Sequence, residues 1–295
     1  MKKNTRRDFL RSSSLAASFA AFSSPKLFQD KAILHLNANT SDPKISLIHS
    51  GGLNGIQYNQ DQLGGLEAIQ KQLHSRSFSS IFLDSGNLIN PNYPILENLE
   101  FLKQVVTCGL SMTTLGNHEL NLPTKELIFL VENSGIRILG NSLEKNGLVL
   151  GKTYFSKAVI QWGKYKIGVL PTRNASLSDI NRKGLELKLL HQCDLLIGLG
   201  PLPNQADLDS LQRKYHEVHH YFIDTNDQSP VGTRVCKSSQ GMEFWVSKPG
   251  SQGKYLGSFE YTLNPSYQLR HFDNLSFVPG EANWDKKMDF LAQYS

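Results

Sequence analysis

The chain has 295 residues, of which 39% are hydrophobic and 19% are charged, a composition typical of a folded globular protein. This length suits one large α/β domain or at most two small ones. The formal net charge of +5 does not indicate nucleic-acid binding, because much of it lies in the first eleven residues and no later segment is rich in lysine or arginine.

The amino-terminal segment has the pattern of an export signal. Residues Thr5–Arg11 include the pair Arg6-Arg7, as in twin-arginine signals, and residues 12–22 form a weakly apolar stretch rich in Ala and Ser. That stretch is too short to span a bilayer, which takes roughly 20 residues, and no Cys follows it for lipid attachment. We predict a twin-arginine signal peptide over 1–23, a periplasmic location and no stable membrane anchor. A helix lying on the membrane surface is the alternative.

Residues 24–43 are polar, contain Pro25 and Pro43, and are predicted to be a linker. A folded domain is expected over 44–278, followed by a carboxyl-terminal tail over 279–295. Apolar periodicity in the first half of this domain predicts alternating strands and helices. The strands are expected at 45–48, 80–83, 112–115 and 136–139, and the helices at 66–73, 95–106 and 124–132. This order predicts a mainly parallel sheet with helices on its faces.

The second half of the domain adds antiparallel strands. Residues 158–162 and 165–170 flank Gly163-Lys164, which is typical of a hairpin. Further helices are expected at 187–190 and 206–215, further strands at 195–198 and 221–223, and a strand-rich region over 233–277. The whole pattern predicts one α/β domain, a sandwich of two sheets.

The three cysteines, Cys108, Cys193 and Cys236, are widely spaced and lack a metal-binding pattern. One disulfide is compatible with a periplasmic protein, but an odd number leaves at least one free thiol. We expect all three to be buried structural residues.

In open α/β sheets, ligands bind where the carboxyl ends of the strands meet. Five predicted strands are followed by loops of the kind that build such sites. These loops cover residues 49–55, 84–87, 116–119, 198–201 and 224–227. The sequence therefore predicts a cleft formed by these loops.

Three of these segments carry a resemblance to a known family: Ile48-His49-Ser50, then Phe82-Leu83-Asp84-Ser85-Gly86, then Leu115-Gly116-Asn117-His118-Glu119. With them, residues 44–263 resemble the metallophosphoesterase domain of the 5′-nucleotidase family of calcineurin-like phosphoesterases, particularly exported bacterial metallophosphatases. The resemblance implies a two-sheet αββα sandwich. It also implies a cleft that holds two metal ions and hydrolyses phosphoric esters.

The same resemblance places most metal ligands at positions that differ in this chain. Gly52 and Asn54 stand where the family has its first Asp and His, and Asn87 stands in place of the bridging Asp. Pro201 replaces a later His, and Thr225-Asn226-Asp227 replaces the closing His-x-His. Asn117 alone remains a family ligand, beside His118, which acts on the phosphate in the family.

These substitutions predict the loss of catalysis. Two neighbouring divalent cations repel each other unless carboxylates neutralise them, and Asn87 brings an oxygen without a charge. Without a metal, no water is acidified to act as the nucleophile. The alternative is a single hard cation, Mg²⁺ or Ca²⁺, held by Asp227 with a weak contact from Asn54.

Three hypotheses about function follow. The first is a non-catalytic binding or regulatory module without a cofactor, whose partner is a protein or a phosphorylated small ligand. The second is an active phosphoesterase with one metal held by Asn117 and Asp227, and with His118 as the acid. The third is a purely structural interaction protein. None of them involves nucleic acid.

Several residues have a structural interpretation beside the functional one. His118 is either a residue that contacts phosphate or one that packs in the turn, and residues 116–119 are compatible with a turn kept for its backbone geometry. Asp84 is expected to fix a loop rather than bind a metal. His219 and His220 are adjacent on a strand and point to opposite faces, so they cannot chelate one ion together.

Overall fold

The computed structural model describes residues 33–38, 44–57, 64–74, 80–140, 153–202, 217–224, 231–263 and 269–277. The chain divides into residues 1–31 and residues 32–295, and every described residue belongs to the second unit. The predicted signal peptide, the carboxyl-terminal tail, the helix at 206–215 and Asp227 lie outside the described residues.

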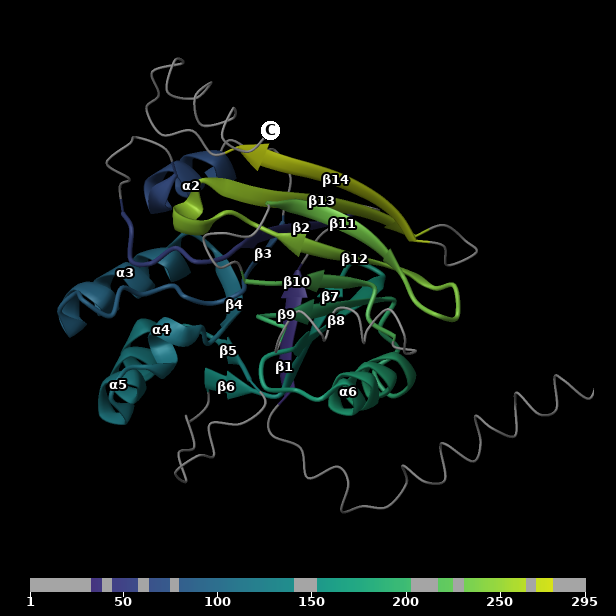
Figure 1. Ribbon diagram of the computed structural model, residues 1–295, viewed down its shortest axis with the longest axis horizontal. Coiled ribbons are helices and arrows are strands. Elements are labelled where there is room, and N and C mark those ends of the chain that lie inside the picture. Colours follow the sequence, from purple (N-terminus) through teal and green to yellow (C-terminus); the bar gives the residue numbers. More distant parts are fainter. Residues whose placement is uncertain are drawn as a thin grey trace, which may run out of the picture. The chain divides into compact units, whose positions relative to one another are not determined.

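One sheet, called here the first sheet, has the strand order β14-β13-β2-β3-β4-β5-β6 (Figure 1). Its strands β2 to β6 run parallel to their neighbours, and β13 and β14 extend it in antiparallel fashion. The bounds are β2 Ile45–Ser50, β3 Ile81–Asp84, β4 Leu110–Thr114, β5 Ile138–Leu139, β6 Tyr154–Phe155, β13 Tyr255–Leu263 and β14 Leu269–Phe277.

The second sheet has the order β1-β7-β8-β9-β10-β12-β11. The bounds are β1 Ile33–Ala38, β7 Lys157–Trp162, β8 Tyr165–Pro171, β9 Leu195–Leu199, β10 His220–Phe222, β11 Gly232–Lys237 and β12 Glu243–Lys248. Strands β7 and β8 form the predicted antiparallel hairpin. Strands β8, β9, β10 and β12 are parallel, so their carboxyl ends share one edge.

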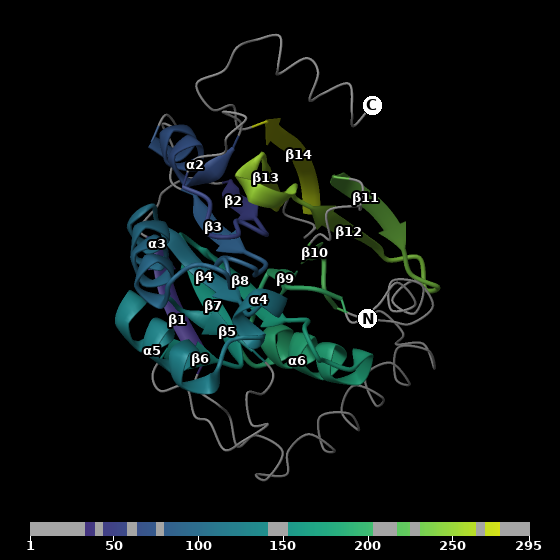
Figure 2. The ribbon, with the colours of Figure 1, turned by 60° about the vertical axis from the view of Figure 1, so that its left-hand side comes forward.

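Three apolar clusters show that the fold has four layers. The cluster between the two sheets includes Leu47 and Met112 from the first sheet and Ile160 and Ile197 from the second. A second cluster joins the outer face of the first sheet to helices α2 (Gly65–His74), α3 (Ile95–Thr107) and α5 (Thr124–Ser134). A third joins the outer face of the second sheet to α6 (Leu177–Leu189). Figure 2 shows α2 and α3 beside β2, β3 and β4, with α5 below α3. The predicted αββα sandwich is confirmed.

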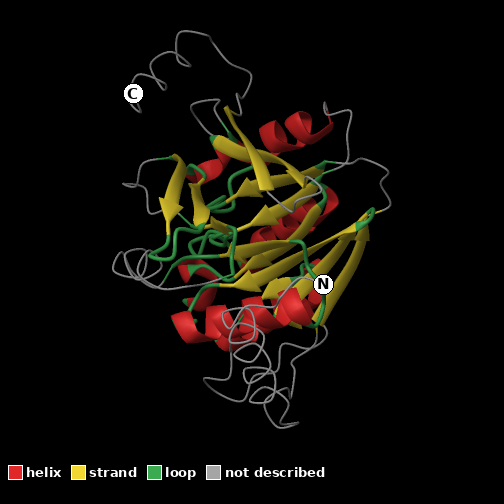
Figure 3. Ribbon diagram, turned by 90° about the vertical axis from the view of Figure 1, so that its right-hand side faces the viewer, coloured by secondary structure: helices red, strands yellow, loops and turns green. Residues whose placement is uncertain are grey.

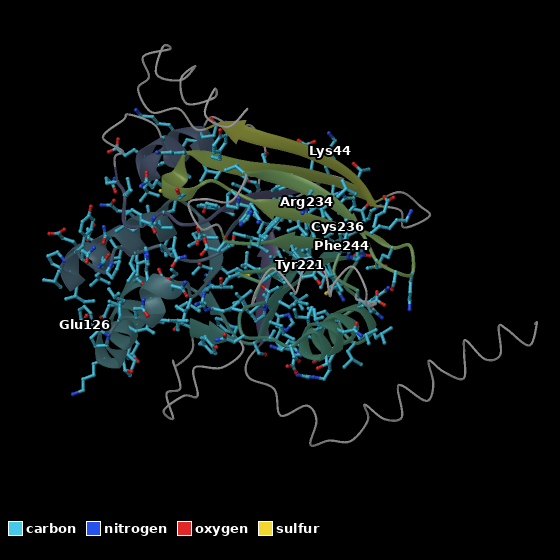
Figure 4. The ribbon with its side chains drawn as sticks, in the orientation of Figure 1. Lys44, Glu126, Tyr221, Arg234, Cys236 and Phe244 are labelled. Carbon is cyan, nitrogen blue, oxygen red and sulfur yellow. The ribbon has the colours of Figure 1, made fainter. Side chains whose placement is uncertain are left out.

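The outer face of the second sheet is packed by aromatic residues. Tyr221 on β10 and Phe244 on β12 contact each other edge to face, with ring centroids 5.9 Å apart (Figure 4). Cys236 on β11 belongs to the same cluster. This cysteine and Cys193 are buried as predicted, whereas Cys108 is only half-buried, and all three thiols are free.

The expected linker over 24–43 is wrong for Ile33–Ala38, which form strand β1. This strand pairs in parallel with β7, and Leu34 is buried between the sheets. The prolines and asparagines on either side suggested a linker, but Ile33, Leu34 and Leu36 supply enough apolar surface for an edge strand.

The helix expected at 187–190 is longer, because α6 begins at Leu177. Ser176 caps its amino terminus, and its hydroxyl accepts a hydrogen bond from the amide of Asp179 at 3.1 Å. The apolar periodicity of this helix is weak because Lys183 and Glu186 occupy buried positions. Lys157 on β7 pairs with Glu186, which makes the burial of this carboxylate tolerable.

Among the helices of the described segments, none combines the length and the hydropathy that crossing a membrane would require.

Candidate functional site

The loops that follow the strands of both sheets gather at one edge of the molecule. Figure 3 shows them in green beside the arrowheads of the strands. The loop after β2 is joined to the loop after β3 by backbone hydrogen bonds from Gly52 to Gly86 and from Asn54 to Asn87, both 2.9 Å. The loop after β4 joins them through Thr114, whose hydroxyl donates to the carbonyl of Ser85 at 2.9 Å. Three of the five predicted loops, those after β2, β3 and β4, therefore come together.

Asp84, the last residue of β3, holds these loops together through hydrogen bonds. Its carboxylate accepts hydrogen bonds from the hydroxyl of Ser50 at 2.6 Å, the amide of Gly86 at 2.7 Å and the hydroxyl of Thr113 at 3.1 Å. Complete burial raises the pKa of Asp84 to about 7, although these three hydrogen bonds act in the opposite direction. The expected loop-fixing role of Asp84 is confirmed.

His49 is a buried neighbour of this anchor. Its Nε2 lies 3.1 Å from the hydroxyl oxygen of Ser85, and its ring stacks on Phe222 with centroids 4.4 Å apart. Burial lowers the pKa of His49 to about 3, so the ring is neutral at ordinary pH. It is part of the packing between the sheets.

The two other histidines singled out in the sequence have separate partners. The Nδ1 of His219 accepts a hydrogen bond from the amide of Leu196 at 3.0 Å. The ring of His220 lies between the sheets, within 2.7 Å of the hydroxyl of Tyr261 and 2.5 Å of the hydroxyl of Ser247. The prediction that this pair does not chelate one ion is confirmed.

The turn at 116–119 is organised by Glu119. Its carboxylate accepts hydrogen bonds from the amides of Gly116 at 2.6 Å, Ile89 at 3.0 Å and Asn87 at 3.1 Å. Three amide donors to one buried carboxylate hold the loops after β3 and β4 in a fixed relation. The short helix α4 (Asn117–Leu120) begins at this point.

The prediction that Gly116 is needed for an unusual backbone conformation is wrong. Its φ of −84° and ψ of −174° are ordinary extended values, and Asn117 does not have a positive φ. Gly116 is required by space instead, because a Cβ at this position would collide with the backbone and side chain of Asn87. The residue with a left-handed backbone is Asn87 itself, with φ 57°.

Asn87, at the position of the family's bridging Asp, is held by its own neighbours. Its Oδ1 accepts a hydrogen bond from the amide of His118 at 3.0 Å, and its Nδ2 donates to Oδ2 of Asp224. Both ends of the amide are therefore engaged within the protein.

Asn117, at the one family ligand position that is unchanged, is exposed but is also engaged by a neighbour. Its Oδ1 accepts a hydrogen bond from Nη2 of Arg173, the second residue after β8. Half-burial lowers the pKa of Arg173, and the charges of Glu119 and Asp224 counteract this effect. A guanidinium remains charged at any physiological pH, so a fixed cation contacts Asn117.

His118 is oriented by the loop after β3. Its Nδ1 lies 3.1 Å from the carbonyl oxygen of Ile89, a geometry that favours the tautomer with the proton on Nδ1. The ring is half-buried. The position of His118 is compatible with both interpretations, which are contact with a phosphate and packing in the turn.

The other predicted site positions, Gly52, Asn54 and Pro201, bring fewer side-chain polar contacts to the site than Asn87 and Asn117 do. Gly52 has a positive φ of 59°, and a Cβ there would lie 3.9 Å from Oδ1 of Asp224. Asn54 also has a positive φ, 55°, and Pro201 lies beside Thr172, whose hydroxyl donates to its carbonyl at 3.2 Å. The predicted strand-end loops include Asp224, whereas sequence reasoning missed Arg173. The position of Arg173 just after a predicted strand could have identified it.

The residues present do not fit the two-metal centre that the fold implies. The Oδ1 atoms of Asn117 and Asn87 already accept N–H groups, Gly52 has no side-chain donor, and Asn87 has no charge to bridge two cations. Within the described ranges, no three His, Cys, Asp or Glu side chains come together in a way that could hold a metal ion.

Comparisons with known proteins identify the fold. No family model matches the sequence, and no curated protein gives a significant match. The crystal structure of the 5′-nucleotidase precursor from Thermus thermophilus is similar with a TM-score of 0.65 at 17% identity, over 84% of this chain and 58% of that one. The NAD nucleotidase of Haemophilus influenzae gives a TM-score of 0.67 at 14% identity, over 85% of this chain and 56% of that one.

A calcineurin-like phosphoesterase from Bacillus subtilis is similar over 85% of this chain and 96% of its own length, with a TM-score of 0.58 at 14% identity. The chain spans only 58% and 56% of the two nucleotidase structures, so their activities do not transfer with the likeness. The four layers and these similarities together show that the protein has the metallophosphoesterase fold of 5′-nucleotidases and calcineurin-like phosphoesterases.

Proposed function

We propose that this protein is an exported, non-catalytic member of the metallophosphoesterase fold that works by binding. The observation that carries this proposal is that the side-chain oxygens of Asn117 and Asn87 already accept hydrogen bonds from the protein. Oδ1 of Asn117 accepts from the guanidinium of Arg173, and Oδ1 of Asn87 accepts from the amide of His118. The oxygen atoms that would face a metal are thus committed to protein N–H groups.

The charge in the cleft supports the same proposal. Asp224 is the carboxylate that faces Asn87, and Arg173 supplies a positive charge close to it. A pair of divalent cations needs several carboxylates to offset its repulsion. The guanidinium of Arg173 offsets part of the carboxylate charge here, so the cleft attracts such a pair less than a site lined by carboxylates alone.

The charges of Asp224 and Arg173 also bear on what kind of partner the cleft binds. A phosphate dianion in the cleft would meet the carboxylate of Asp224 as well as the guanidinium of Arg173, and like charges repel. This favours a partner protein over a phosphorylated small ligand. Inorganic phosphate is accordingly expected to leave the melting temperature unchanged, and stabilisation by phosphate would move the proposal to a phosphorylated ligand.

The second candidate is an active phosphoesterase with a reduced, one-metal site. The orientation of His118 supports it, since Nδ1 is tied to the carbonyl of Ile89 and an acid or base must be held in one tautomer. Asn117 and Asp227 would hold the metal, and the latter lies outside the described residues.

A turnover assay distinguishes the two candidates. The purified protein is incubated with p-nitrophenyl phosphate in the presence of Mn²⁺, Mg²⁺, Zn²⁺ or Ca²⁺, together with His118→Ala and, as a matched control, His74→Ala at the exposed end of α2. The proposal expects no turnover above the buffer in any sample. Turnover that disappears in His118→Ala and persists in His74→Ala would establish the active enzyme.

A further inference from the structure

We propose that Arg173 is an internal substitute for the lost catalytic cation, which supplies the positive charge of the cleft and keeps divalent metal ions out. The inference rests on the proposed non-catalytic function and concerns how that state is maintained. Its starting point is the place of Arg173 in the fold. It follows β8 of the second sheet, whereas Asn117 and Glu119 follow β4 of the first.

The contacts of Arg173 are those that a cation in this cleft would make. Its guanidinium donates to Oδ1 of Asn117, and it is close enough to Glu119 and Asp224 for both carboxylates to favour its charged form. Asp224 in turn accepts from Nδ2 of Asn87. A chain of polar contacts thus runs from the second sheet through the cleft to the two positions that resemble family metal ligands.

The charge balance gives a reason for this arrangement. Glu119 is buried and accepts three backbone amides, and Asp224 accepts from a neutral amide, so the guanidinium of Arg173 acts on two carboxylates. A buried carboxylate is costly unless it is paired or strongly hydrogen-bonded. Without the guanidinium, Asp224 would lose a nearby positive charge.

The same geometry excludes a metal. A divalent cation bound to Oδ1 of Asn117 would have to displace Nη2 of Arg173, and the displaced guanidinium would remain a close like charge. Removal of the guanidinium should therefore have two effects: a less stable cleft, and an Oδ1 of Asn117 that has lost its guanidinium donor close to the carboxylate of Asp224. Carboxylate and amide oxygens suit hard cations such as Mg²⁺ and Mn²⁺.

The test is the melting temperature of the full chain with and without millimolar Mn²⁺. Arg173→Ala is expected to melt about 2–4 °C below the wild type, which is the shift that the loss of one charged hydrogen bond typically causes in a domain of about 150–250 residues. Mn²⁺ is expected to restore at least about half of that loss in Arg173→Ala and to leave the wild type unchanged. The rescue should vanish in the double variant Arg173→Ala/Asp224→Asn.

Two further variants separate charge from packing. Arg173→Lys keeps the positive charge, and Arg173→Gln keeps an N–H donor without it, so the lysine variant should be the more stable and should not respond to Mn²⁺. This comparison also serves if Arg173→Ala does not fold. Arg182→Ala is the matched control, because Arg182 lies on α6 and makes only a long surface ion pair with Asp179, 3.8 Å.

The outcomes are distinct. An Arg173→Ala protein that melts like the wild type, a loss that Mn²⁺ does not restore, or a glutamine variant at least as stable as the lysine variant would overturn the role of Arg173. The proposed function would survive any of these results. Stabilisation of the wild type by Mn²⁺ together with turnover that depends on His118 would instead overturn the proposed function.

Discussion

At Asn117 and Asn87, identical side-chain amides stand at the edge of the same cleft and are engaged by different neighbours. The first faces the guanidinium of Arg173, and the second is fixed between the amide of His118 and the carboxylate of Asp224. The sequence could indicate that both positions face the cleft, because each follows a strand. It could not indicate what fills the cleft, since Arg173 comes from a strand of the other sheet and its approach depends on how the two sheets pack.

Glu119 offers the sharpest stability test among single residues. Its carboxylate accepts three backbone amides, so Glu119→Gln replaces one acceptor oxygen by a donor that faces an amide. We expect a loss of about 2–4 kcal/mol in the free energy of unfolding. Urea denaturation measures it, with Glu126→Gln on the exposed surface of α5 (Figure 4) as the control. Equal unfolding midpoints for the two variants would contradict the role assigned to Glu119.

At the scale of elements, most strands and helices of the first sheet could be predicted from apolar periodicity. Strand β2, for example, is buried along its whole length. Strand β1 and the first part of α6 could not be predicted. The former lies at a sheet edge among polar residues, and the latter buries Lys183 and Glu186, which weakens the periodic pattern. In both segments the local sequence pattern is weak, and contacts with the rest of the fold determine the secondary structure.

The ion pair between β7 and α6 is expected to matter for stability. Lys157 and Glu186 have side chains only 1% and 4% exposed. Lys157→Ala should cost about 3–5 kcal/mol, because it leaves a buried carboxylate uncompensated. The control is Lys44→Ala, whose pair with Glu260 is 55% and 35% exposed and should be worth less than about 1 kcal/mol. Similar unfolding midpoints in urea for the two variants would contradict this interpretation.

Strands β2 and β3 carry two buried groups whose pH effects oppose each other. The pKa of His49 is about 3 in the folded protein against 6.5 ordinarily, so the unfolded chain binds more protons between these values and stability falls as the pH falls. The pKa of Asp84 is about 7 against 3.8, so here the folded protein binds more protons and stability rises as the pH falls. Between pH 3.8 and 6.5 the two effects offset each other.

His49→Phe should remove one of the two effects. Relative to the wild type, its stability should rise as the pH is lowered from 6.5 to 4, by up to about 1.4 kcal/mol per pH unit. The measurement is a series of urea unfolding curves across this range. A difference in the free energy of unfolding between the two proteins that stays the same at every pH would show that His49 does not titrate with the expected pKa.

At the scale of the whole molecule, the four layers and the converging loops are those of a metallophosphoesterase, while the cleft carries a different set of charges. The fold class could be predicted from the resemblance, and the structure confirms it. The resemblance also indicated that most ligand positions are altered. Asp224 belongs to one of the predicted strand-end loops, but the contact of Arg173 with Asn117 could not be predicted, because Arg173 follows a strand of the other sheet.

Export is the second expectation at this scale. The pair Arg6-Arg7 within Thr5–Arg11 predicts transport in the folded state. Replacement of both arginines by lysine should leave the protein in the cytoplasm with unchanged stability, as followed by cell fractionation. Export of the variant at the wild-type level would contradict the prediction of a twin-arginine signal.

The metal content of the wild-type protein tests the central claim most directly. The full chain is purified without chelators and analysed by inductively coupled plasma mass spectrometry, then dialysed against Mn²⁺, Fe²⁺, Zn²⁺, Mg²⁺ or Ca²⁺ and analysed again. Because Arg173 supplies the cation of the cleft, we expect well under one equivalent of any metal per chain in every sample. One or two equivalents of tightly bound metal, lost in a variant with Asn117→Ala, would contradict the account.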